Sequence, residues 1–163
     1  MKSLSPTQIR ASFVNVTQGE AERISMPPLH DVIWGEREYL GWRDQQSHQR
    51  GYLVHWVADR PVGIVLRASE FSLQPGIPAM CALCGITRSS DRVTLFSAPR
   101  AGQSGRDGNT IGTYLCDDLA CSHLIRVLPP GTALQTPEDL LEQRIEGLLQ
   151  RTQGFTANVM KSA

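Results

Sequence analysis

Four cysteines in two close pairs constrain the fold of this 163-residue chain more than any other feature. Two residues separate Cys81 from Cys84, and four separate Cys116 from Cys121. Two pairs this far apart in a chain favour a tetrahedral zinc site over a lone redox pair. A knuckle with two intervening residues directs both thiolates at one ion, and Gly85 suits the positive φ that such a turn often needs. The spacing predicts one Zn²⁺ ion bound by Cys81, Cys84, Cys116 and Cys121.

Three other uses of these cysteines stay open. They could form two disulfides in a secreted chain, serve a redox or iron–sulfur role, or lie as unrelated thiols in a core. Residues 1–6 lack an apolar signal core, so we expect a cytoplasmic protein whose thiols stay reduced. His123 follows Cys121 by two residues and could replace one ligand, although we expect it either at the surface or beside the ligands without binding the metal. A site with all four ligands filled is structural rather than catalytic.

The segments around the cysteines predict a treble-clef zinc finger, which consists of a knuckle, a β-hairpin and a helix. Residues 93–97 and 110–115 have the composition of a strand pair. A glycine-rich loop, residues 99–109, lies between them. We expect Cys116 and Cys121 at the start of a helix near Asp117, where the helix dipole stabilises a thiolate.

The N-terminal part of the chain predicts short helices followed by a β meander. Ser5 and Pro6 form a helix start, and residues 17–25 fit a second short helix. Residues 58–61 form a tight turn between two of the expected strands. Three runs rich in β-branched and aromatic residues predict an antiparallel meander at 39–42, 52–57 and 62–66.

The clearest helix lies near the C-terminal end. Thr136 would cap it and Pro137 would take its first helical position, while Gly154 would end it. Its apolar stripe has helical spacing and comprises Leu141, Ile145, Leu148 and Leu149. These elements together predict an α+β fold in two parts. Residues 1–78 hold the N-terminal helices and the antiparallel β region, and residues 79–163 hold the treble-clef module with the C-terminal helix.

Charge is balanced along the chain, with 16 acidic residues against 16 lysines and arginines. Residues 81–130 carry five basic and four acidic groups, so no basic arm is concealed there. We therefore do not expect direct nucleic-acid binding, which favours a strong basic excess. No apolar run approaches the roughly 20 residues that span a bilayer, so we expect no membrane partner.

Residues 80–121 resemble a known family. Three features occur together: the two cysteine pairs, the Ala-Pro-Arg-Ala-Gly loop at residues 98–102 and the Gly-Asn-Thr-Ile-Gly-Thr-Tyr run at residues 108–114. This combination resembles the FBP-type treble-clef zinc finger. That finger is the C-terminal module of elongation factor G-binding proteins, which include the FusB-like fusidic acid resistance proteins.

The resemblance implies a non-enzymatic adaptor whose finger docks on elongation factor G and modulates its interaction with the ribosome. In resistance members, this docking helps the factor leave a stalled ribosome. Those members carry a substantial N-terminal helical bundle, whereas only about 30 residues look helical before the β region of this chain. The resemblance therefore predicts factor binding and leaves drug resistance open. The alternative function is a zinc-containing module that binds RNA or the ribosome.

Arg100 and Arg106 are candidate partner-binding residues in the glycine-rich loop. Arginine pairs with phosphate or carboxylate in a bidentate manner, although the loop could equally be a flexible hairpin connection. Glu36 and Glu38 fit an exposed strand face. The aromatic residues between positions 34 and 56 could stack on bases, but we expect them in the core. No Gly-x-Ser-x-Gly elbow or other catalytic constellation is present, so we expect no enzyme and no catalytic residues.

Overall fold

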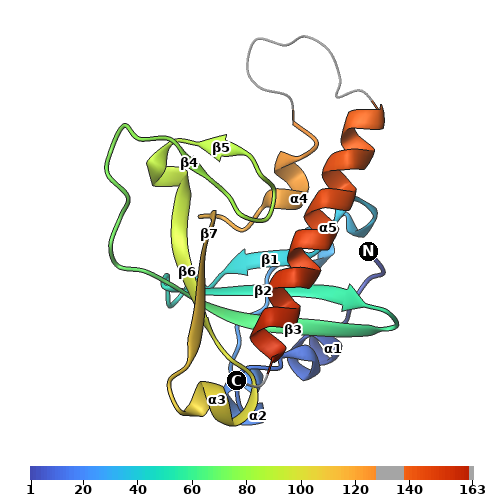
Figure 1. Ribbon diagram of the computed structural model, residues 1–163. Helices are drawn as coiled ribbons and strands as arrows, with labels where there is room; N and C mark the ends of the chain where they lie inside the picture. The colour runs from blue at the N-terminus through green and yellow to red at the C-terminus, as the bar shows by residue number, and fades with distance from the viewer. Residues whose placement is uncertain (128–137, 162–163) are drawn as a thin grey trace.

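A five-stranded antiparallel sheet forms the centre of the protein, with the strand order β1-β2-β3-β6-β7 (Figure 1). The computed structural model describes residues 1–127 and 138–161. Two shorter strands, β4 (Ala79–Met80) and β5 (Thr87–Arg88), pair with each other outside this sheet. The main strands are β1 (Leu40–Arg43), β2 (Arg50–Val57), β3 (Arg60–Ala68), β6 (Val93–Pro99) and β7 (Thr110–Cys116).

Helices flank the sheet, and none of those described has the length and apolarity needed to cross a membrane. The first two begin where the sequence predicts, because Ser5 and Thr17 form capping boxes with Gln8 and Glu20. The α-helices are α1 (Pro6–Ser12), α2 (Gln18–Glu22), α3 (Gly102–Arg106), α4 (Cys121–Leu124) and α5 (Glu138–Met160). Short 3-10 helices occupy Leu29–Asp31, Trp34–Glu36 and Ser90–Arg92.

The predicted meander is confirmed as β1, β2 and β3, but its second turn is tighter than expected. β2 ends at Val57 and pairs there with Arg60, so only Ala58 and Asp59 connect the strands. Ala58 has a φ of 51°, a conformation that a two-residue hairpin turn requires. Arg60 and Pro61 therefore belong to β3 rather than to the turn.

Three predicted boundaries in the second half of the chain are wrong. The loop at 99–109 contains the short helix α3. The helix expected near Asp117 begins only at Cys121 and has four residues, so Cys116 ends a strand instead. Gly154 lies inside α5, where it faces open space. Packing of Leu148 and Phe155 on the sheet side carries the helix through this glycine. The expected cap at Thr136 and Pro137 lies outside the described residues.

Both faces of the meander formed by β1, β2 and β3 are largely buried, each against a different set of elements. Alternation along β2 directs Leu53 to one face and Tyr52 and Val54 to the other, as the sequence predicts. The first face packs against α5, which crosses β2 and β3 in Figure 1, and against the four cysteines. The second face packs against residues of the N-terminal helices, among them Ile9 and Ala21.

The two parts expected from the sequence share one sheet and one core. β3 and β6 lie on either side of residue 78 and are neighbouring strands. Their pairing is narrow, because only Arg67 with Ser97 and Ala68 with Phe96 are in register. The first core cluster nevertheless combines Leu53 and Leu66 with Phe96 and Leu115. The division at residue 78 stays a prediction.

Of the aromatic residues between positions 34 and 56, Tyr39, Trp42 and Tyr52 are buried as expected, and Trp34 and Trp56 are half-buried against the core. Trp42 and Tyr52 lie 4.9 Å apart between ring centroids and are buried together with Phe13 against them. Their polar atoms have partners inside the fold, since Trp42 Nε1 donates to the Ser25 carbonyl and Tyr52 Oη donates to Asp44. A stacking platform for bases would need these ring faces in solvent.

One buried histidine predicts acid sensitivity. His55 is fully buried on β2, where Nε2 lies 2.7 Å from Thr156 Oγ1 of α5. Thr156 donates its proton to the Thr152 carbonyl, so Nε2 is the donor to Thr156. Burial lowers the pKa of His55 to about 4. The folded state therefore disfavours the charged ring, and stability is lost as the pH falls from about 6.5 towards 4.

We expect the free energy of unfolding to drop by about 2 kcal/mol between pH 7.5 and pH 5 through His55 alone. Urea unfolding at the two pH values measures it. The variant His55→Gln supplies the control, because glutamine does not titrate and its own pH dependence can be subtracted. An equal loss of stability in both proteins would contradict this assignment.

Candidate metal centre

The first cysteine pair lies on a knuckle between β4 and β5. Cys81 directly follows β4, and its amide donates to the Ile86 carbonyl at 3.1 Å. The Gly85 amide donates to the Cys81 carbonyl at 2.9 Å, which closes the turn around Cys84. Gly85 has a φ of 73°, so the expected need for glycine at this position is confirmed.

The second pair is held by a loop that sits on the sheet. Cys116 is the last residue of β7, and Cys121 is the first residue of α4. Between them, Leu119 is buried and adopts a φ of 55°, which is rare for a residue with a side chain. The Leu119 carbonyl oxygen lies close to Gly41 of β1. A Cβ atom added at Gly41 would be only 2.5 Å from this oxygen. The four intervening residues thus let the loop pack on β1 and still return Cys121 to the cluster.

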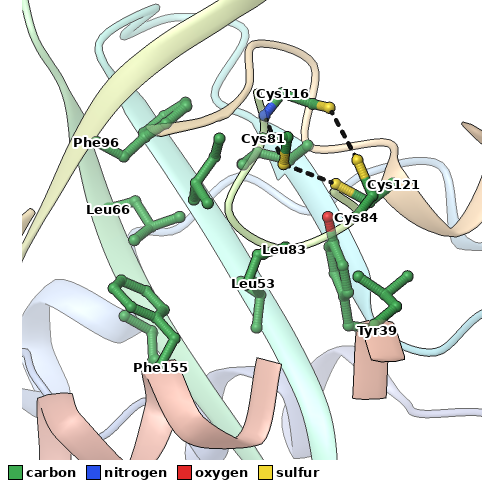
Figure 2. Close-up of a cluster of buried hydrophobic side chains, with 14 of the residues drawn as sticks. Tyr39, Leu53, Leu66, Cys81, Leu83, Cys84, Phe96, Cys116, Cys121 and Phe155 are labelled. Carbon is green, nitrogen blue, oxygen red and sulfur yellow. Dashed lines mark hydrogen bonds between the residues drawn. The ribbon is translucent and has the colours of Figure 1, made fainter. Parts of the chain in front are cut away.

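The four cysteine sulfur atoms converge on one point (Figure 2). They all lie within 4.8 Å of one another and are buried. The Sγ atoms of Cys81 and Cys121 are 3.7 Å apart, as are those of Cys84 and Cys116. A tetrahedron with Zn–S bonds of about 2.3 Å has sulfurs about 3.8 Å apart. The donor set and its spacing fit a single zinc ion.

The alternatives left open by the sequence fit this geometry less well. Disulfide-bonded sulfurs lie about 2.05 Å apart, far closer than the sulfurs here, and all four cysteines are free. Without a metal, the four sulfurs hydrogen-bond to one another, so some are favoured as thiolates and others as thiols. Hydrogen bonding with Cys116 lowers the pKa of Cys81 and Cys84 and raises the pKa of Cys121. A divalent cation removes the competition for protons among the four sulfurs, because it stabilises all four as thiolates.

Comparison with known proteins agrees with the metal centre. The family profile described as FBP C-terminal treble-clef zinc-finger matches residues 8–159. The chain belongs to this family. Zinc is therefore the metal that the four clustered cysteines are placed to bind.

A structure of the fusidic acid resistance protein FusC resembles this member of the FBP zinc-finger family. The two chains are 22% identical, with a TM-score of 0.56. The alignment covers 75% of this chain and 52% of the FusC chain, so the protein spans about half the length of FusC. No curated protein sequence matches. At this level of identity, the likeness to FusC establishes the shared fold.

The FBP finger of this chain has the predicted treble-clef parts: the knuckle, the β6–β7 hairpin and α4. α5 is tied to the knuckle, since Arg151 Nε donates to the Leu83 carbonyl at 2.6 Å. His123 is exposed on α4 and lies outside the sulfur cluster. Of the two positions expected for His123, the structure shows the one at the surface.

The two arginines predicted to bind a partner have different environments. Arg100 is partly buried, and its Nη1 donates to the carbonyls of Asn158 and Lys161 at 2.6 and 3.4 Å. Arg100 therefore stabilises the C-terminal end of α5. Arg106 is exposed at the end of α3, and its Nε donates only locally, to Gln103 at 3.0 Å. Their role in partner binding stays a prediction.

One structural pair near the finger was missed from the sequence. Glu38 was expected on an exposed strand face, but it is only 7% exposed and precedes β1. Both of its carboxylate oxygens accept from Arg126, at 2.8 and 2.9 Å. The Glu38 amide donates to Ser122 of α4 at 3.0 Å. Because Glu38 and Arg126 are 88 positions apart in the sequence, no local pattern could reveal this contact.

Proposed function

We propose that this protein is a non-enzymatic zinc-finger adaptor that binds translation elongation factor G and modulates its interaction with the ribosome. The observation that carries the proposal is family membership, since the FBP zinc-finger match extends over residues 8–159. The fold likeness to a fusidic acid resistance protein supports it. Direct RNA binding is the competing function.

Within this proposal, Cys81, Cys84, Cys116 and Cys121 are the four zinc ligands. Four thiolates complete the tetrahedral shell and leave no position for a water molecule, so the metal stabilises the fold and does no chemistry. The protein acts through the surface of the finger, whose conformation the metal stabilises. This arrangement supports binding rather than catalysis as the function.

The surface proposed to meet the factor lies on the outer side of the β6–β7 hairpin. Leu95 and Tyr114 are opposite each other in register and are 36% and 42% exposed. Met80 is 62% exposed, and Ala82 of the adjoining knuckle donates its amide to the Tyr114 carbonyl. Arg106 lies on the connection between the two strands. Exposed apolar groups and arginine side chains are typical of the residues that dominate protein interfaces, and Arg106 lies at the α3 end of the same hairpin.

We expect the double variant Leu95→Ser with Tyr114→Ala to bind elongation factor G at least about tenfold more weakly than the wild type. Isothermal titration calorimetry with purified factor and zinc-loaded protein measures this. Ile33→Ser is the matched control, because Ile33 is 60% exposed and lies outside the hairpin. Equal affinities for all three proteins would remove the hairpin surface from the interface.

Charge reversal and salt separate the two candidate functions. Arg106→Glu should weaken factor binding, whereas Arg60→Glu on the β2–β3 hairpin should not. Binding to the factor should change little between 50 and 200 mM salt. A fall of about a thousandfold or more over this range would indicate many phosphate contacts. Such a slope, measured with ribosomes or RNA, would instead favour the RNA-binding function.

A further inference from the structure

Two buried polar atoms beside the sulfur cluster have no hydrogen-bond acceptor among the described residues. They are Tyr39 Oη and Arg88 Nη1. Arg88 Nη1 lies 3.6 Å from the Asp118 carboxylate, which is ion-pair distance but too long for a hydrogen bond. Leaving such a donor unsatisfied destabilises a fold, so each needs a partner in the active form of the protein.

Tyr39 reaches the cluster from outside the finger. It directly precedes β1, is 1% exposed and belongs to the same buried cluster as all four cysteines. Figure 2 shows its hydroxyl pointing towards the cysteine sulfurs. Cys121 is the sulfur with which this hydroxyl interacts most strongly. A phenol hydroxyl has one proton that it can donate to a hydrogen bond.

Arg88 reaches the cluster from β5, just beyond the knuckle. Its guanidinium interacts with the Cys116 sulfur and with the carboxylate of Asp118, two residues further along the chain. Four thiolates around Zn²⁺ carry about two net negative charges. A guanidinium at this position offsets part of that charge inside a buried site.

We propose that Tyr39 and Arg88 are positioning residues of the zinc centre, which donate hydrogen bonds to the metal-bound thiolates of Cys121 and Cys116 and thereby slow the loss of zinc. The inference rests on the proposed ligand assignment. A thiolate that accepts a hydrogen bond is a weaker base and a weaker nucleophile. It is therefore protonated or alkylated more slowly, and it stays bound to the metal longer. Tyr39 also makes the zinc centre depend on residues outside the finger.

The test compares zinc release from variants that remove one donor each. Tyr39→Phe keeps the ring and removes the hydroxyl, and Arg88→Gln removes the guanidinium. Two matched controls isolate the contact with sulfur. Tyr114→Phe removes an exposed tyrosine hydroxyl, and Arg92→Gln removes the other arginine that pairs with Asp118.

Zinc transfer to the chromophoric chelator 4-(2-pyridylazo)resorcinol gives the rate of metal loss. We expect Tyr39→Phe and Arg88→Gln to lose zinc about 10-fold faster than the wild type, and the controls to match it. Replacement of zinc by Co²⁺ gives a second readout, because the sulfur-to-cobalt charge-transfer band shifts when a thiolate loses a hydrogen bond. A merely structural role would not move this band.

Rates within twofold of the matched controls, with an unchanged cobalt band, would overturn the inference. Should one variant fail to fold, the other variant decides through its rate relative to its own control. If the wild-type protein binds one zinc ion, the ligand assignment stands even when neither variant loses zinc faster than its control. Failure of wild-type protein to bind zinc would instead reject the ligands themselves.

Discussion

Replacing Cys84 by serine is expected to release the zinc ion and unfold the finger. A structural zinc ion contributes on the order of 10 kcal/mol to small zinc modules, which is comparable with the whole stability of a domain, about 5–15 kcal/mol. The four cysteines belong to the main core cluster together with Leu53, Leu66 and Phe96. The loss should therefore extend from the finger into the sheet.

Zinc content by elemental analysis and the melting temperature by circular dichroism measure the Cys84→Ser effect. The control is His123→Ala, because His123 lies close in sequence to a ligand but is exposed. We expect this variant to retain one zinc ion and the wild-type melting temperature. A Cys84→Ser protein with full zinc content and an unchanged melting temperature would contradict the ligand assignment.

Replacing Arg126 by methionine is expected to lower the free energy of unfolding by about 3–5 kcal/mol. The change leaves the Glu38 carboxylate, whose side chain is 6% exposed, without its bidentate partner. A buried carboxylate that loses its hydrogen-bonded cation is costly because water does not solvate it. The lost hydrogen bond from Arg126 to the Ser122 carbonyl adds to this effect.

Urea unfolding of three variants and the wild type separates the charge effect from lost packing. The pair Glu38→Gln with Arg126→Met removes both charges and should be more stable than Arg126→Met alone. Arg60→Met, at an exposed arginine of β3, should unfold like the wild type. If the double variant were as unstable as Arg126→Met, loss of packing rather than the unpaired carboxylate would explain the result.

The features that the sequence predicted well are those set by neighbouring residues. Helix starts at Ser5 and Thr17 follow from side chains that cap nearby amides, and the Gly85 turn follows from one allowed conformation. The metal centre could be predicted because cysteine is a specific metal ligand and because its spacing along the chain is informative.

Features that depend on distant residues were not predictable in this way. The helix expected near Asp117 is short because Leu119 turns into a left-handed conformation against Gly41. Glu38 is buried only because Arg126 meets it, and Gly154 continues a helix because the residues around it pack on the sheet. In each case, tertiary packing outweighs the local preference.

The narrow seam between β3 and β6 has a mechanical consequence. β2 and β3 pair over eight residues and β6 and β7 over seven, whereas two pairs join β3 to β6. In Figure 1, β6 and β7 run steeply across the direction of β2 and β3. A load that pulls the finger away from the meander would meet few backbone bonds at this seam. The shared side-chain core and α5 would resist this load, because they hold the β1–β3 meander and the β6–β7 hairpin together.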